Sequence, residues 1–239
     1  MTSHPRPYTG RVIGVHDVSA DTRKITVEIE GRLRLPFGAG QYMQLSVEGF
    51  EQRPFSIASA PHEPLLEFHI KNSGRGLSAH IAEALQPGHP ITLEGPLGQS
   101  HWKPAAEDAP VRPLLMLAGG LGIAPLKSII TACLHGRNHP PVHLYWGVRT
   151  GAQLYLDDFF RDLAKKNPRF SYIPVISDET DATEHRTGLI GHAVAEDFET
   201  LAGFSIYMAG PAAMIDATLP LLLHKNAEED YIFSDGFGL

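Results

Sequence analysis

The feature that most constrains the fold is a change of pattern near residue 112 of the 239-residue chain. Before it, short segments in which apolar and polar residues alternate lie between glycine and proline turns, which predicts half-buried strands. After it, apolar segments and longer segments of helical spacing follow each other in turn, which is typical of a doubly wound parallel sheet. We therefore expect two domains: an antiparallel Greek-key β-barrel over residues 1–104 and an α/β domain with a doubly wound parallel sheet over residues 105–239.

The spacing of apolar residues predicts the elements of each domain. In the first we expect strands over 9–18, 23–30, 41–47, 54–58, 65–70 and 91–93, and one helix that carries Leu77 and Ile81 behind a Ser78 cap. In the second we expect strands over 114–118, 142–148, 170–176, 205–209 and 231–233, and helices over 125–135, 154–166, 191–198 and 212–225. Pro220 should kink the last helix. A linker over 102–112 joins the two domains.

Charge and cysteine content exclude several classes of protein. Lys and Arg number 20 against 27 Asp and Glu, and without a basic cluster this net charge of −7 repels nucleic acid. One cysteine, Cys133, excludes an internal disulfide, a thiolate zinc site and an iron–sulfur cluster held by this chain alone. No apolar run is long enough to cross a membrane, and the first residues lack the apolar segment of a signal peptide. We expect a cytoplasmic protein that contacts neither membrane nor nucleic acid.

The chain's 13 histidines are the remaining feature that could indicate a metal. His135, His139 and His143 are spaced by four residues, but Pro140 and Pro141 interrupt any helix that would align them. We interpret them as surface histidines in a loop and expect no metal site.

The sharpest local motif is a glycine-rich segment after a buried strand, Gly119-Gly120-Leu121-Gly122-Ile123-Ala124-Pro125. Glycine lets backbone amides approach a ligand closely, and the amino terminus of the following helix adds positive potential that suits a pyrophosphate. Proline in the first helical turn costs nothing, because that amide has no partner in the helix. The glycines are not in GxGxxG order, and an ordinary tight turn explains these residues alone equally well.

Two further segments carry groups that suit a nucleotide. Arg53-Pro54-Phe55-Ser56 places a cation, an aromatic ring and a hydroxyl on one strand, with Arg53 and Phe55 on one side and Ser56 on the other. Gly74-Arg75-Gly76-Leu77-Ser78 precedes a helix and has the composition of a phosphate cradle. Taken singly, the first is common on edge strands, and the second is also what a capped helix after a flexible turn shows.

In their order and spacing these motifs resemble the ferredoxin–NADP reductase superfamily. They are joined by Tyr145-Trp146-Gly147-Val148-Arg149, Arg186-Thr187-Gly188, Ala209-Gly210-Pro211 with Met214, and Ser234-Asp235-Gly236-Phe237. The similarity covers nearly the whole chain and is greatest to flavin reductases and to the reductase modules of multicomponent oxygenases. It implies a flavin in the barrel and a nicotinamide dinucleotide in the α/β domain.

The resemblance also implies roles for single residues. The flavin would be held by Arg53, Pro54, Phe55, Ser56 and His69, and its phosphate by Gly76, Leu77 and Ser78. The dinucleotide site would be formed by Gly119, Gly120, Gly122, Ile123, Pro125, Arg149, Gly210, Pro211 and Met214. Ser56, near flavin N5, and Asp235, close to the flavin ring together with Phe237, would be the catalytic residues. Two positions depart from the pattern: Ala209 stands where many relatives have cysteine, and Leu121 where threonine is common.

The implied function is that of an NAD(P)H-dependent flavin oxidoreductase. Hydride passes from NADH or NADPH to FAD or FMN, and electrons pass on to a ferredoxin, an oxygenase component or another acceptor. Two alternatives stay open: a reductase that releases flavin as its product, and a non-catalytic subunit that binds nucleotides or senses redox state. We expect both nicotinamide cofactors to be accepted. Arg149, with no acid before Asp157, suits a 2′-phosphate and favours NADPH. The segment Gly147-Val148-Arg149 followed by Leu154-Tyr155 instead resembles that of relatives that use NADH.

Overall fold

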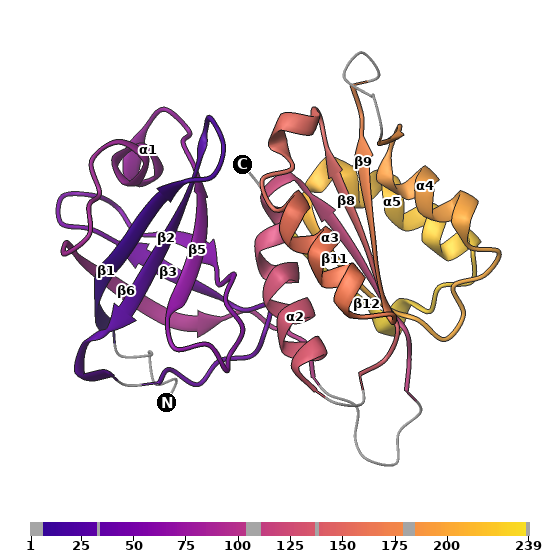
Figure 1. Ribbon diagram of the computed structural model, residues 1–239, viewed down its shortest axis with the longest axis horizontal. Coiled ribbons are helices and arrows are strands. Elements are labelled where there is room, and N and C mark those ends of the chain that lie inside the picture. Colours follow the sequence, from indigo (N-terminus) through magenta and orange to yellow (C-terminus); the bar gives the residue numbers. More distant parts are fainter. Residues whose placement is uncertain (1–6, 33, 104–110, 137–138, 179–184, 238–239) are drawn as a thin grey trace. The chain divides into compact units, whose positions relative to one another are not determined.

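The computed structural model describes residues 7–32, 34–103, 111–136, 139–178 and 185–237 (Figure 1). The chain divides into two compact units, Met1–Lys103 with Lys127–His135, and Pro104–Leu126 with Gly136–Leu239. The predicted boundary between residues 104 and 105 lies outside the described residues, as does most of the predicted linker. In the parts of the chain that the structure describes, no helix is long and apolar enough to span a membrane.

The first unit is built on a six-stranded antiparallel sheet whose strands run in the order β4-β3-β6-β1-β2-β5. Its elements are β1 (Tyr8–Asp17), β2 (Thr22–Ile29), β3 (Tyr42–Ser46), β4 (Arg53–Ser56), β5 (Leu66–Lys71), α1 (Gly76–Glu83) and β6 (Pro90–Leu97). The two edge strands meet through an antiparallel bridge between Ile57 and Phe68, so the sheet curls on itself. The predicted antiparallel barrel is confirmed.

The interior of this barrel is filled by one side of each strand, as the alternating sequence pattern requires. On β5, Leu66, Phe68 and Ile70 belong to the apolar core. Glu67 and His69 therefore point to the outer face of the strand. Most outer positions of a barrel meet solvent, but His69 is only 5% exposed.

The second unit is a six-stranded sheet with the strand order β10-β9-β8-β7-β11-β12, and every neighbouring pair is parallel. Its strands are β7 (Leu114–Gly119), β8 (Val142–Val148), β9 (Phe170–Ile176), β10 (Arg186–Thr187), β11 (Ser205–Pro211) and β12 (Ile232–Phe237). The helices are α2 (Ile123–His135), which continues into the first unit, α3 (Asp157–Lys166), α4 (Ile190–Asp197) and α5 (Ala212–His224). Figure 1 shows α3 on one face of the sheet and α4 and α5 on the other. The predicted doubly wound parallel sheet is confirmed.

The strand order reverses between β7 and β11. In an open parallel sheet, the carboxyl ends of the two strands at such a reversal diverge into loops on opposite faces and leave a crevice where ligands bind. The segment Gly119–Pro125 begins at the last residue of β7, and the segment Gly210–Met214 begins with the last two residues of β11. The topology thus places both predicted dinucleotide loops at the switch point.

Several predicted boundaries are wrong by a few residues for local reasons. Helix α2 begins at Ile123 rather than at Pro125, because a 3₁₀ turn over Gly120–Gly122 leads directly into it. Helix α3 begins at Asp157, since the preceding residues form a separate turn closed by a capping box between Thr150 and Gln153. Strand β4 ends at Ser56, β12 runs on to Phe237, and the two-residue β10 was not predicted.

Candidate functional site

Strand β4 carries the Arg53–Ser56 motif and presents its residues in three different environments. Arg53 is exposed and pairs with Glu51 at 3.2 Å. Phe55 is half-buried and packs against the barrel core. Ser56 is buried, with 9% of its surface exposed. Because Ile57 points into the core, the alternation of the strand turns Ser56 to the outer face.

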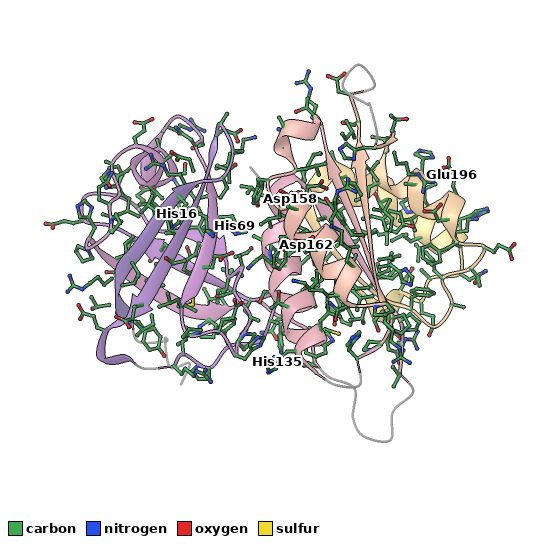
Figure 2. The ribbon with its side chains drawn as sticks, viewed as in Figure 1. His16, His69, His135, Asp158, Asp162 and Glu196 are labelled. Carbon is green, nitrogen blue, oxygen red and sulfur yellow. The ribbon has the colours of Figure 1, made fainter. Side chains whose placement is uncertain are left out.

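Beside Ser56, the outer face of β5 carries a buried polar network. Glu67 Oε1 lies 2.8 Å from His69 Nε2 and 2.9 Å from Lys127 Nζ. Lys127 also donates to the carbonyl of Ala58 at 3.3 Å. Burial by itself raises the pKa of Glu67, but the hydrogen bond from His69 and the charge of Lys127 lower it to about 2. Figure 2 labels His69 within this unit.

The amino terminus of α1 has the properties of a phosphate cradle. Gly74 and Gly76 have φ angles of +73° and +61°, and a Cβ atom at either would meet nothing within 4 Å. Ser78 is not the helix cap, which corrects the sequence prediction: the N-cap is Arg75, and no side chain caps the helix. Ser78 lies in the first turn, where its hydroxyl lies 2.5 Å from that of Ser73. The first backbone amides of α1 are therefore left for a ligand or water.

Leu77 could contribute to the predicted cradle only through its backbone. Its side chain is 3% exposed and belongs to the barrel core. The same holds for Ile123 and Pro125 in the second unit, whose side chains are buried at the start of α2. Such residues fix the position of a loop, and only their main-chain atoms can face a ligand.

In the second unit, most glycines of the two predicted loops exist for packing. A Cβ atom at Gly122 would lie 1.9 Å from the carbonyl oxygen of Ala209, and one at Gly119 would lie 2.5 Å from Met214 Sδ. A Cβ atom at Gly210 would lie 2.9 Å from Gly119 Cα. The loops after β7 and β11 thus touch each other, and a side chain at any of these glycines would push them apart.

Gly120 differs from these glycines because it faces open space. Its φ is +52°, and a Cβ atom there would meet nothing within 4 Å. Its carbonyl accepts a hydrogen bond of 2.9 Å from the indole Nε1 of Trp146 on β8. The buried Trp146 ring also packs edge-on against Tyr155 and Phe160. Trp146 therefore fixes the turn through the Gly120 carbonyl, while the side of Gly120 on which a Cβ atom would lie is open.

The carboxyl end of β12 lies at the same edge of the sheet. In the register of β11 and β12, Asp235 pairs with Ala209, and Phe237 pairs with Pro211. Burial raises the pKa of the Asp235 carboxyl. The structure thus brings Asp235 next to the second predicted loop.

At the end of β8, Arg149 has an acidic neighbour that the sequence prediction missed. Arg149 is exposed, and its Nε lies 4.0 Å from Asp178 Oδ2. Asp178 follows β9, and its amide donates to the Arg149 carbonyl at 2.9 Å. Asp178 is distant from Arg149 in the sequence, but the parallel sheet brings the end of β9 beside the end of β8.

The histidines spaced by four residues do not form a metal site. His135 is the last residue of α2, and its ring stacks on that of His62. His143 lies in β8 and not in the predicted loop. Its side chain is half-buried, with Nδ1 2.8 Å from the Ser171 hydroxyl. Among the described residues, no group of three or more metal-ligating side chains is close enough to hold an ion.

The observed geometry fits a flavin and a dinucleotide. The barrel offers a helix start without a side-chain cap and, on β4, the buried hydroxyl of Ser56, and the sheet offers an accessible glycine turn at its switch point. A barrel and a doubly wound sheet of this kind define a class of two-domain oxidoreductases. Residues 9–102 match the family of oxidoreductase FAD-binding domains, and residues 116–219 match that of oxidoreductase NAD-binding domains.

Individual relatives agree with this class. The chain is 32% identical to an NAD(P)H-flavin reductase of Vibrio harveyi, over 95% of this chain and 97% of that protein. It is 31% identical to the ferredoxin–NAD(P)(+) reductase component of the naphthalene 1,2-dioxygenase system of Pseudomonas putida, over 99% of this chain and 71% of that one. An Amycolatopsis cytochrome P450 reductase superposes with a TM-score of 0.88 at 31% identity, covering 99% of this chain and 72% of that one. The chain therefore belongs to the ferredoxin reductase-like family of flavin-dependent oxidoreductases, and it is an NAD(P)H-dependent flavin oxidoreductase.

Proposed function

We propose that this enzyme keeps its flavin bound and delivers electrons to a separate acceptor protein. The observation that carries this proposal is the α1 amino terminus, where two open glycines of positive φ, Gly74 before the helix and Gly76 as its first residue, flank an N-cap that makes no side-chain hydrogen bond. A flavin phosphate would satisfy these amides and gain from the helix dipole. The phosphate favours FAD or FMN over a flavin without one. The P. putida relative, named as a reductase component of a dioxygenase system, supports a ferredoxin or an oxygenase component as the acceptor.

A flavin bound at these positions would supply the redox chemistry, with NAD(P)H as the hydride donor, and the protein supplies binding and orientation. Ser56 offers a hydroxyl for a hydrogen bond at flavin N5, and Arg53 offers a cation for the flavin phosphate. Gly120 leaves the nicotinamide dinucleotide close access to backbone amides, and Pro211 and Met214 form the opposite side of that site. Asp235, whose burial favours the protonated carboxyl, would influence flavin reoxidation.

A second candidate function is the release of reduced flavin as a product. It is favoured by the V. harveyi relative, named as an NAD(P)H-flavin reductase, because this chain spans 97% of that protein. The third, a nucleotide-binding or redox-sensing subunit without turnover, has no observation in its favour.

A cytoplasmic location completes the proposal, since a chain whose one cysteine is buried needs no oxidising compartment.

The test compares purified protein before and after gel filtration. Bound flavin predicts about one equivalent of yellow cofactor per chain and NADH-dependent reduction of a ferredoxin or dye without added flavin. Loss of the colour, with activity restored only by added riboflavin or FMN at substrate concentrations, would establish the free-flavin reductase. Absence of NADH and NADPH oxidation under both conditions would leave the non-catalytic subunit.

The role of Arg53 has its own test with a matched control. Arg53→Ala removes a charge-assisted contact worth about 1.5–3 kcal/mol, so flavin affinity should fall by about ten- to a hundredfold. Arg11→Ala changes another exposed arginine of the barrel, which pairs with Glu30 at 3.8 Å, and should leave flavin affinity unchanged. Equal affinities in both variants would remove Arg53 from the site.

A further inference from the structure

The first unit buries ionisable side chains from two distant parts of the sequence in one network: Glu67 and His69 on β5, and Lys127 on α2. The exposed fractions of these side chains are 15%, 0% and 8%. Both basic groups share one oxygen, Glu67 Oε1, at 2.8 Å and 2.9 Å. Buried ion pairs contribute little net stability compared with apolar side chains of the same size, because desolvation offsets their attraction. The network therefore points to a role beyond stability.

The network lies on the same face of the strands as Ser56. The bridge between Ile57 and Phe68 joins the end of β4 to β5, and both of these side chains point into the barrel core. Ser56 precedes Ile57, and His69 follows Phe68, so both turn to the outer face. Lys127 closes the network by donating to the Ala58 carbonyl, two residues beyond Ser56. Figure 2 shows His69 in this unit.

In this network two basic side chains, His69 and Lys127, contact a single carboxylate, that of Glu67. Lys127 pairs with the Glu67 carboxylate at 2.9 Å and is the cation that balances it. Lys24 on β2, which pairs with His69 in the strand register, adds further positive potential at the imidazole. A proton on His69 would then add a second positive charge beside a single carboxylate in a buried site. Burial lowers the pKa of His69 in agreement with this arrangement.

We propose that Lys127 is a positioning residue for the flavin site, which keeps His69 neutral and its Nε2 hydrogen directed at Glu67 on the face that carries Ser56. This inference rests on the proposed function, in which Ser56 orients the flavin. Glu67 requires one positive partner. Lys127 supplies it, so His69 does not have to. Flavin binding is therefore independent of pH across the range in which exposed histidines titrate, about 5.5–7.5.

Removal of Lys127 should cause His69 to become protonated at a higher pH than in the wild type. In Lys127→Met, Glu67 keeps its charge, and His69 becomes the remaining group able to compensate it. The expected result is an increase of at least about one unit in the pKa of His69, measured by NMR on labelled protein without flavin and assigned by the signal missing in His69→Gln. Lys24→Met is the matched control, since Lys24 touches neither Glu67 nor the Ala58 carbonyl, and its effect should be small. Lys127→Arg should behave like the wild type.

A double variant separates this mechanism from simple disruption. In Lys127→Met with Glu67→Gln, no carboxylate remains to be compensated, so His69 should be neutral again. The double variant also contains no unpaired buried charge, and it should fold more stably than Lys127→Met alone. If Lys127→Met does not fold, the titration of His69 is compared between Lys127→Gln and the double variant instead. An unchanged His69 titration in the folded single variant would overturn the proposal.

Flavin binding supplies the second readout. The dissociation constant of the flavin should vary with pH in Lys127→Met, with a midpoint at the measured pKa of His69, and should not vary in the wild type or in Lys127→Arg. A His69 pKa that moves while flavin binding stays independent of pH would show that the network does not serve the flavin site. Because the NMR titration needs no flavin, failure of the proposed function would appear separately, as wild-type protein that binds no flavin at all.

Discussion

At the scale of single residues, the glycines of the dinucleotide loops have two distinct physical roles. Gly119, Gly122 and Gly210 allow the loops after β7 and β11 to touch, and their neighbours leave no room for a Cβ atom. Gly120 has open space around it, and position 120 favours glycine because its φ is positive. The sequence motif presents these glycines as one group, but only Gly120 is placed to let a ligand approach the backbone.

Gly120→Val and Gly122→Val form a matched pair that tests this distinction. The valine at 120 meets no atom but is strained by about 1–2 kcal/mol in the left-handed region, so the protein should fold and the KM for NADH should rise far more than that for flavin. The valine at 122 collides with the Ala209 carbonyl and should lower the melting temperature sharply. The measurements are steady-state kinetics and thermal unfolding of both variants. If the 120 variant lost flavin and NADH binding together, its effect would be misfolding.

Arg149 and Asp178 give a second prediction at this scale, on cofactor preference. Arg149 can pair with a 2′-phosphate, while Asp178 beside it would repel that phosphate and accept a hydrogen bond from a free 2′-hydroxyl. Arg149→Ala should therefore reduce kcat/KM for NADPH more than for NADH, and Asp178→Asn should shift the ratio towards NADPH. Each shift should be about tenfold, or 1.4 kcal/mol. Equal changes with both cofactors would show that this pair does not read the 2′-position.

At the scale of elements, the sequence predicts the strands and helices, because these depend on residues that are close together in the chain. Periodicity identified the strands and helices, and Leu114–Gly119 is buried throughout because a central parallel strand is covered on both faces. The misplaced start of α2 follows from the 3₁₀ turn over Gly120–Gly122, which is too short to show a period in the sequence. The partnership of Glu67 with Lys127 could not be predicted, since the two residues are far apart in the sequence and meet only in the folded chain. A lysine inside the apolar run of α2 was the one signal available.

The link between β8 and the glycine turn is testable as an interaction between elements. Trp146→Phe keeps an aromatic ring against Tyr155 and Phe160 but removes the indole donor to the Gly120 carbonyl. A hydrogen bond of this kind contributes about 0.5–1.5 kcal/mol, so the dissociation constant for NADH should rise by about two- to tenfold, with flavin binding unchanged. Isothermal titration calorimetry measures both constants. Trp102→Phe, at the chain's other tryptophan, is the control and should change neither.

At the scale of the whole molecule, each unit has its own apolar core. In the first unit, Glu67, His69 and Lys127 are ionisable side chains that are at most 15% exposed, and their ionisation links the folding of the barrel to pH. The net charge of −7 has no such specific effect, because most of the charged side chains lie at the surface. Acid stability should therefore depend on the network more than on overall charge.

This dependence leads to a prediction whose sign follows from the two pKa shifts. The folded pKa of His69 lies below the usual 6.5, so as pH falls through 6.5 the unfolded chain binds a proton that the folded chain does not, and stability decreases. Glu67 adds a second loss below its usual 4.5, which continues to its folded pKa of about 2 and amounts to at most about 3 kcal/mol.

Urea unfolding of the wild type, His69→Gln and Glu67→Gln between pH 7 and pH 3 checks both steps. Glutamine at 69 can still donate to Glu67 but cannot titrate, so that variant should lose less stability than the wild type between pH 7 and pH 5. Glu67→Gln should be less stable at pH 7, because Lys127 loses its charged partner, but should lose less below pH 4.5. Stability curves that run parallel for all three proteins would show that the network does not set the acid stability of the barrel.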